Sequence, residues 1–311
     1  MERTDMDSLP LVSVCIITYN SSSTVAETLE GMFSQTYPRL ELLVSDDCSQ
    51  DDTVDICRQW IEKHKDRFER TEIIVREKNG GVAANLNTVI RACRGAWIKY
   101  LAGDDILLPD CIQDNIDYVA SHAATEIVFS KMRYFEEAGG KRIVTEYCKP
   151  EPELLSFFDL PAQEQYCKLL YSCRVIPGVT VFQKKEFAVG HPLPEDYSYC
   201  EDWPHWTHLT KSGIRLRCFD KETVLYRMNG SLSHAVASSF INERFHTSMM
   251  AFFYSERYQE LKALDRKEAI KQKKEFFLGE VAIVLLGNRR NLFTRAILYL
   301  FKLMVGERKV Q

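Results

Sequence analysis

The sequence predicts an α/β fold in which a mostly parallel sheet is flanked by helices and followed by a C-terminal helical extension. Two observations predict this architecture. Short apolar runs alternate with segments of helical periodicity between residues 11 and 108, and such alternation with short links is typical of right-handed βαβ units. Beyond residue 238 the strand patterns stop, and amphipathic helical patterns remain at residues 240–264 and 267–286.

The composition is that of a globular protein, with 311 residues of which 45% are hydrophobic and 27% charged. The net charge of -4 argues against nucleic-acid binding. The ten cysteines form no Cys-x-x-Cys pair, which argues against a zinc site, and free thiols in apolar runs indicate a reducing compartment. The N-terminus does not resemble a signal peptide, and no apolar run is long enough to span a membrane. We therefore expect a cytoplasmic protein.

The first predicted strand is the apolar run of residues 11–20, which has the pattern of a buried parallel strand. Its carboxyl end carries Thr18, Tyr19 and Asn20. Three serines then form a polar turn, and the spacing of the apolar residues beyond them predicts a helix that ends before Pro38.

The next two predicted strands are residues 40–44 and 72–75, and each ends in a polar turn. Asp47 follows the first of them, ahead of a helix with acids at its N-terminus. The second is followed by Asn79-Gly80-Gly81, where glycine permits close approach of the backbone to a ligand, and by a helix over residues 82–93.

The fourth predicted strand, residues 97–101, stops abruptly at Gly103 and the acidic pair Asp104-Asp105. Ligands of open α/β sheets bind just outside the carboxyl ends of the strands. Two carboxylates there suit Mg²⁺ or Mn²⁺, which usually hold phosphates as well. A solvated acidic turn is the alternative interpretation.

Residues 109–237 have a mixed pattern. The predicted elements are strands at 126–130, 179–182 and 224–227, a hairpin at 132–144 with Gly139-Gly140 at its tip, and helices at 111–120 and 203–212.

The polar strand ends together describe a nucleotide-diphosphate pocket, because the carboxyl ends of parallel strands converge. Asp47 can accept hydrogen bonds from a base or a ribose hydroxyl. The sequence has neither a P-loop nor a Gly-x-Gly-x-x-Gly motif, which argues against an ATPase and against a dinucleotide-dependent dehydrogenase.

Five ordered motifs resemble those of the family 2 glycosyltransferases, across roughly residues 11–234. They are residues 12–20, 34–38, 41–53, 79–82 and 101–105. The resemblance implies a GT-A fold over residues 1–237, with a nucleotide-sugar half at 11–108 and an acceptor half at 109–237, and a separate helical region at 238–311. It also implies an inverting transfer from a nucleoside-diphosphate sugar, with UDP favoured, assisted by Mn²⁺ or Mg²⁺.

By position, the resemblance implies that Thr18, Tyr19 and Asp47 line the base and ribose and that Asp104 is the principal metal ligand, with Asp105 beside it. Asn20, Asn79 and Gly81 belong to the same predicted donor site. The sequence departs from the family in two places. Ala102 stands where the family often has Asp, and Leu86 stands where it often has Arg. The neighbouring amides of Asn85 and Asn87 are candidates to replace that arginine as donors.

The acceptor half carries Glu201-Asp202 at the start of a predicted helix. A transfer to a hydroxyl group needs a base to take its proton as it attacks the anomeric carbon. The resemblance assigns that role to Asp202, with Glu201 as the alternative base or an acceptor-positioning group. Helix capping by two acids is the structural alternative. Trp203 and Trp206 on the same helix can stack on a sugar acceptor or pack in the core.

Three further assignments rest on the resemblance. Arg227 would hold the leaving diphosphate, or would serve a structural role. His234 would be a third metal ligand, or an exposed loop histidine. The chain lacks both the Gln-x-x-Arg-Trp motif and the membrane spans of processive synthases, so we expect transfer of one or a few sugars. The resemblance implies a hexosyl or N-acetylhexosaminyl group as the transferred sugar. It also implies a saccharide or lipid-linked acceptor that belongs to a cell-surface polysaccharide or glycoconjugate.

The C-terminal tail, residues 288–311, mixes basic and apolar residues. Such a segment fits contact with an anionic membrane surface, which would place the protein peripherally on the inner face of the cell membrane, or packing within a homo-oligomer. Two rival functions stay open. One is a catalytically silent nucleotide-sugar-binding scaffold of a glycan assembly complex, and the other is a sugar-phosphate nucleotidyltransferase.

Overall fold

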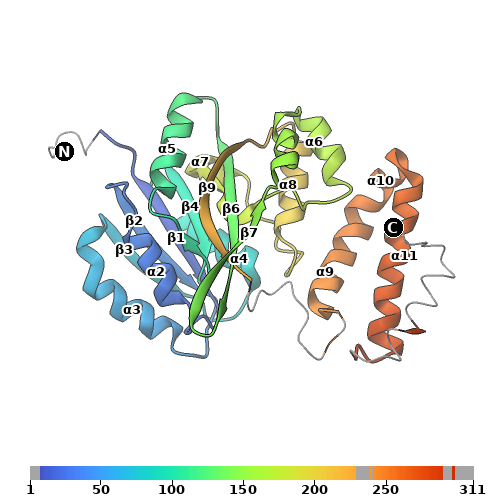
Figure 1. Ribbon diagram of the computed structural model, residues 1–311, viewed down its shortest axis with the longest axis horizontal. Helices are drawn as coiled ribbons and strands as arrows, with labels where there is room; N and C mark the ends of the chain where they lie inside the picture. The colour runs from blue at the N-terminus through green and yellow to red at the C-terminus, as the bar shows by residue number, and fades with distance from the viewer. Residues whose placement is uncertain (1–7, 229–238, 240, 290–295, 298–311) are drawn as a thin grey trace.

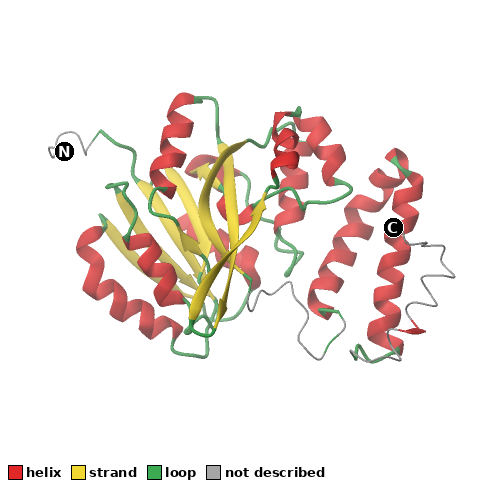
Figure 2. Cartoon of the chain, viewed as in Figure 1, coloured by secondary structure: helices red, strands yellow, loops and turns green. Residues whose placement is uncertain are grey.

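A computed structural model describes residues 8–228, 239, 241–289 and 296–297. A twisted sheet of nine strands forms its centre, with helices packed on both faces (Figures 1 and 2). Four neighbouring strands are parallel and follow the order β3-β2-β1-β4. They are β1 (Val12–Thr18), β2 (Leu40–Asp46), β3 (Arg70–Val75) and β4 (Trp97–Ala102). The predicted parallel βαβ units are therefore present.

Both faces of β1 are buried, which explains its continuous apolar sequence. Alternate residues belong to different cores, since Val14 and Ile16 contact the core on one face while Cys15 contacts the core on the other. The first core contains α2 (Val25–Phe33), α3 (Thr53–His64) and α5 (Cys111–Ser121), whereas the second contains α4 (Gly81–Ala92). All four loops that leave the parallel strands consequently meet at one edge of the sheet.

The second half of the sheet is mixed, and so the prediction of a mostly parallel sheet holds only for the first half. Strand β8 lies antiparallel between β4 and β6, and β6 runs parallel to β9. Register shifts interrupt the β6–β9 pair. The elements are β5 (Ile106–Leu107), β6 (Ile127–Ala138), β7 (Lys141–Lys149), β8 (Phe182–Lys184) and β9 (Cys218–Arg227). The predicted strand and hairpin at 126–144 are thus one long β6 paired with β7.

Three helices cover the second core beside this half of the sheet. They are α6 (Ala162–Leu169), α7 (Lys185–Gly190) and α8 (Asp202–Lys211). Helix α8 packs on α6 and inserts Trp206 and Leu209 into the core. This packing fixes the first turn of α8, which carries Glu201 and Asp202, against the sheet.

The C-terminal helices form a separate layer, on the right in Figure 1. They are α9 (Glu243–Phe252), α10 (Tyr258–Leu264) and α11 (Arg266–Glu280), and a π-helical turn joins α9 to α10. Phe252 packs edge-on against Tyr197 and Trp203, so this layer contacts the α8 region. The predicted C-terminal helical extension is present. None of the described helices has the length and apolarity needed to cross a bilayer.

Candidate active site

The ends of β1 and β2 are tied together by buried polar side chains. Thr18 donates from Oγ1 to Asp46 at 2.7 Å, and Asp46 also accepts the backbone N–H of Ser49 at 2.8 Å. Asn20, with a φ of 51°, accepts the N–H of Gln50 at 2.8 Å. Tyr19 and Asn20 are both exposed, and the exposed fraction of Tyr19 is 48%. Tyr19 is thus the predicted donor-site residue at this strand end whose ring is open to a ligand.

Asp47 holds the turn that starts α4. Its Oδ1 accepts the N–H of Gly80 at 3.0 Å and a guanidinium N–H of Arg76 at 2.6 Å, and its Oδ2 accepts the N–H of Gly81 at 2.8 Å. Gly81 has a φ of +84°, which favours glycine. Asn79 lies exposed and also accepts the N–H of Gly81. The predicted residues Asp47, Asn79 and Gly81 therefore form one hydrogen-bonded unit beside the strand ends.

Asn85 is buried and bridges three elements. Its carbonyl accepts from Ser45 Oγ at 2.6 Å, and its amide donates to the carbonyls of Ser45 and Thr18. Asn87 likewise exchanges hydrogen bonds with the backbone of Leu193. Both amides are used inside the protein, so the structure positions them as supports for the strand ends and does not direct their donors toward a nucleotide.

The acidic turn after β4 separates its two carboxylates. Asp105 is 2% exposed and accepts the N–H of Arg227 at 2.9 Å, and burial raises its pKa well above the usual range. Beneath the turn lies the buried ammonium of Lys99, which donates to the Val179 carbonyl at 2.5 Å; burial lowers its pKa to about 8. Asp105 thus anchors the turn from inside the protein.

Asp104 is the other carboxylate of the acidic turn. Burial raises the pKa of its carboxyl group, and the Arg227 guanidinium opposes that rise. Among the described residues, no group of three or more His, Cys, Asp or Glu side chains is placed to hold a metal. Mg²⁺ commonly uses one or two carboxylates together with substrate phosphates, so Asp104 and Asp105 fit a cation that arrives with a diphosphate. His234 lies outside the described residues.

Arg227 is buried and bonds to three different parts of the chain. Its Nε donates to the Asp104 carbonyl at 2.8 Å, and its terminal nitrogens pair with Glu27 and Glu137. The guanidinium also lies over the Phe135 ring, 4.6 Å from the centroid. Arg227 therefore neutralises two carboxylates and holds the acidic turn. Its predicted contact with a leaving diphosphate would require exchange of one of these partners.

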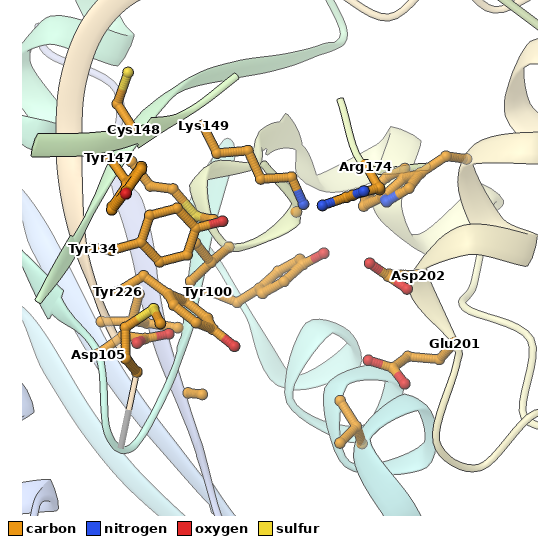
Figure 3. A pocket seen from close by; sticks show the side chains of 18 of the residues that line it. Tyr100, Asp105, Tyr134, Tyr147, Cys148, Lys149, Arg174, Glu201, Asp202 and Tyr226 are labelled. Atoms are coloured by element: carbon orange, nitrogen blue, oxygen red, sulfur yellow. The ribbon is translucent and has the colours of Figure 1, made fainter. Parts of the chain in front are cut away.

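A cavity of about 990 Å³ joins the two halves of the chain, at the upper end of the range typical of small-molecule sites. Asp105 lies on one side, and Glu201 and Asp202 lie on another (Figure 3). Ala102 also lines the cavity. Four tyrosines contribute to its wall, namely Tyr100, Tyr134, Tyr147 and Tyr226. The structure thus brings Asp105 of the predicted metal-binding turn and the predicted base Asp202 to the same cavity, whereas Asp104 does not line it.

Glu201 and Asp202 differ in environment. Burial, with the neighbouring Asp202 charge, raises the pKa of Glu201 to about 8, so this carboxyl group is largely protonated at neutral pH. Asp202 accepts the N–H of Trp203 through Oδ1 at 2.7 Å. Its Oδ2 lies beside Gly178, 3.5 Å from the position that a Cβ on Gly178 would occupy. One oxygen therefore accepts a backbone N–H at the start of α8, while the other lies beside Gly178 in the cavity wall.

The two tryptophans of α8 have different positions. Trp203 points away from the cavity and donates its indole N–H to the Leu169 carbonyl at 2.8 Å. Trp206 lines the cavity, and its buried indole N–H has no partner among the described residues. Of the two predicted acceptor residues, the structure thus places only Trp206 where it can contact an acceptor.

The comparison with known families agrees with this architecture. The sequence model described as Glycosyl transferase family 2 matches residues 13–186, more than half of the 311 residues. The chain belongs to glycosyl transferase family 2.

Two curated relatives illustrate the range of this similarity. The putative glycosyltransferase EpsE of Bacillus subtilis (strain 168) is 33% identical over 153 residues, covering 49% of this chain and 53% of EpsE. The chain thus spans about half the length of that relative. The Escherichia coli protein named UDP-Glc:alpha-D-GlcNAc-diphosphoundecaprenol beta-1,3-glucosyltransferase WfaP is 28% identical over 228 residues, covering 72% of this chain and 80% of WfaP.

Two solved structures share the fold. S. aureus TarS 1-349 in complex with UDP-GlcNAc superposes with a TM-score of 0.55 at 18% identity, covering 94% of this chain and 80% of that chain. The mannosyltransferase PcManGT from Pyrobaculum calidifontis, in complex with GDP-Man and Mn²⁺, superposes with a TM-score of 0.53 at 17% identity. The superposition covers 97% of this chain and 82% of that chain. These neighbours confirm the GT-A fold expected of this family 2 chain.

Sequence reasoning missed several residues of the cavity. The β6–β7 hairpin supplies Tyr134, Tyr147 and Lys149, and the loop after α6 supplies Arg174. The predicted hairpin ended at residue 144, before Lys149, and no motif singles out Arg174. A longer alternating pattern through β7 is the signal that could have extended the hairpin to the cavity.

Proposed function

We propose that this chain is an inverting, metal-dependent glycosyltransferase that moves a sugar from a nucleoside-diphosphate donor, UDP in the first instance, to a hydroxyl group of a saccharide or lipid-linked acceptor. One observation carries the proposal. Asp202, whose Oδ1 accepts a backbone N–H while its Oδ2 lies beside Gly178, lines the same cavity as Asp105 of the acidic turn. A base and a diphosphate-binding turn on one cavity are the two parts that such a transfer needs.

The donor would bind along the strand ends. The exposed ring of Tyr19 after β1 offers a surface on which a base can stack. Asp47 supports the turn of Gly80 and Gly81 from the end of the neighbouring strand β2. Names of similar proteins support the donor class, because WfaP is named for UDP-Glc and the TarS complex contains UDP-GlcNAc. The WfaP name also supports a diphosphate-linked saccharide as the acceptor.

The chemistry follows from the two carboxylate groups. Asp202 accepts the proton of the acceptor hydroxyl as its oxygen forms a bond to the anomeric carbon, and the bond from that carbon to the diphosphate oxygen breaks on the opposite face. Inversion results from this single displacement. A divalent cation held by Asp104, with Asp105 beside it, would neutralise charge on the departing nucleoside diphosphate. Arg227 holds the turn on which both carboxylates sit.

Asp202 is a better base than Glu201. With a pKa of about 8, Glu201 carries its own proton at neutral pH and cannot readily accept another. In the protonated form, Glu201 can donate a hydrogen bond to a substrate oxygen. We therefore assign proton acceptance to Asp202 and a positioning role to Glu201.

The test compares Asp202→Asn with Asp196→Asn, an exposed carboxylate outside the cavity. Release of UDP from a panel of UDP-sugars is measured with Mn²⁺, with and without saccharide acceptors, and donor binding is followed by thermal shift. We expect Asp202→Asn to lower acceptor-dependent release by at least about 100-fold, with donor binding retained, and Asp196→Asn to resemble the wild type. Transfer at the wild-type rate by Asp202→Asn would disprove the assignment. Donor binding without any turnover by the wild type would instead favour a silent scaffold.

A further inference from the structure

Two cationic side chains line the acceptor side of the cavity and have no assigned role. Lys149 ends strand β7, and Arg174 lies in the loop between α6 and the short 3₁₀ turn Gly178–Thr180. Figure 3 shows the Lys149 ammonium and the Arg174 guanidinium directed toward the same part of the cavity, near Asp202 and across from Asp105. Two separate elements thus bring positive charge to one place.

Neither cation is neutralised by a carboxylate among the residues that the structure describes. Within the described part of the chain, neither Lys149 nor Arg174 forms an ion pair within 4.0 Å. Glu151 also lines the cavity but stays beyond that distance. Other arginines at this edge of the fold have carboxylate partners, as Arg133 has Glu222 and Arg227 has Glu27. Two converging unpaired cations repel each other until an anion is present.

We propose that Lys149 and Arg174 bind an anionic group, a phosphate or a carboxylate, carried by the acceptor close to its reactive hydroxyl. The proposal rests on the proposed function, since it uses Asp202 to define the acceptor side. A guanidinium presents a planar fork that matches both anions, and an ammonium adds a second charge.

The position of the cations separates this site from the donor site. The donor diphosphate is expected at the Asp104-Asp105 turn, on the opposite side of the cavity in Figure 3. The acceptor hydroxyl must lie beside Asp202, which is where the two cations converge. Tyr134 and Tyr147 form the adjoining wall and provide aromatic surface for the sugar or for an attached apolar group. The acceptor therefore combines a sugar ring with a nearby negative charge.

The test offers each candidate acceptor sugar in three forms: a neutral decyl glycoside, a decyl diphosphate ester at the anomeric carbon, and the decyl glycoside of the corresponding uronic acid. Wild type is compared with the double variant K149Q/R174Q and with Lys141→Gln, a lysine on the same strand outside the cavity. We expect the wild type to prefer one anionic form over the neutral form by at least about tenfold in kcat/KM. The preferred form identifies the anion as phosphate or carboxylate.

The double variant should lose about 10- to 100-fold in kcat/KM for the anionic acceptor, the range of charge-assisted hydrogen bonds. Its KM for the UDP-sugar, and its activity on the neutral acceptor, should change less than about twofold. Lys141→Gln should match the wild type. A preference that survives in the double variant overturns the proposal, as does an equal loss on neutral and anionic acceptors. A raised KM for the donor would place the cations in the donor site instead.

A binding measurement keeps this inference separate from the proposed function. Decyl phosphate and decyl glucuronide are added to UDP-saturated protein, and the thermal shift of wild type is compared with that of K149Q/R174Q. Stabilisation of the wild type alone supports the anion site even if no acceptor is glycosylated. Absence of any difference refutes the anion site even if transfer to neutral acceptors confirms the glycosyltransferase.

Discussion

The guanidinium of Arg257 lies over the indole ring of Trp203, 3.7 Å from its centroid. Arg257 comes from the turn between α9 and α10, whereas Trp203 directly follows Asp202. Arg257 also donates to the Leu170 carbonyl at 2.6 Å and to Gln272 of α11 at 2.8 Å. One buried cation thus connects the C-terminal helices with the first turn of α8.

Replacement of Arg257 by Leu should therefore affect both stability and turnover. The variant loses a desolvated cation–π contact and leaves the Leu170 carbonyl unpaired, which we expect to lower the free energy of unfolding by about 2–3 kcal/mol. A looser α8 start should lower kcat more than donor affinity. Urea unfolding and steady-state kinetics measure the two effects.

Gln272→Ala provides the matched control, because it removes one partner of Arg257 and leaves the Trp203 contact. Its kcat should stay close to that of the wild type. If Arg257→Leu loses stability while kcat is unchanged, the C-terminal helices stabilise the fold without positioning Asp202.

Glu201 predicts a pH effect on stability. Its pKa rises from 4.5 in the unfolded chain to about 8 in the fold, chiefly through burial. Between these pH values the folded state binds more protons than the unfolded state, so this group makes stability fall as pH rises. The difference between the two pKa values corresponds to at most about 5 kcal/mol in the free energy of unfolding, and structural relaxation around the charged carboxylate reduces this value.

Glu201→Gln should remove that contribution. The variant should become more stable than the wild type at pH 8 while differing little near pH 5, because Gln mimics the protonated carboxyl group. Chemical denaturation at several pH values checks this expectation. Parallel pH profiles for the two proteins would show that Glu201 titrates normally in the fold.

Asp104 and Asp105 should respond differently to conversion into Asn. Asp104→Asn removes the candidate metal ligand, and we expect Mn²⁺-dependent binding of a UDP-sugar to weaken by at least about tenfold, with little loss of stability. Asp105→Asn keeps an oxygen that can accept the Arg227 N–H, so the turn should be preserved. Titration calorimetry at several Mn²⁺ concentrations distinguishes the two. Equal metal dependence in wild type and Asp104→Asn would exclude Asp104 as a ligand.

The sequence was most informative about the first half of the fold, for a physical reason. Strands buried on both faces give continuous apolar runs, and their polar ends mark the edge where ligands bind. This logic places Tyr19, Asp47 and the Asp104-Asp105 turn at that edge from the sequence alone. It did not reveal that Asp47 and Asn85 use their polar atoms to hold the strand ends together.

The second half was harder to predict because its pairing is non-local. Strand β8 is only three residues long, yet it pairs with β4, whose partner residues lie more than 80 positions earlier, and with β6, whose partner residues lie more than 50 positions earlier. Register shifts break the alternation of the β6–β9 pair, so the sequence of β6 has the pattern of a strand followed by a separate hairpin. The meeting of Lys149 with Arg174 depends on this tertiary arrangement, which explains why the cavity wall was missed.

Cys48 supplies a last prediction, since it adopts a φ of 67° that side chains with a Cβ seldom tolerate. Its sulfur makes only long contacts, such as 3.6 Å to the Glu77 carbonyl. Cys48→Gly should therefore relieve strain and raise the free energy of unfolding by about 1 kcal/mol, although glycine adds entropy to the unfolded chain. Asn20→Gly, at a φ of 51°, should instead destabilise, because it loses the hydrogen bond from the N–H of Gln50. Guanidinium denaturation measures the free energy of unfolding of both variants. A destabilised Cys48→Gly would show that the Cys48 side chain stabilises the fold by more than its backbone strain destabilises it.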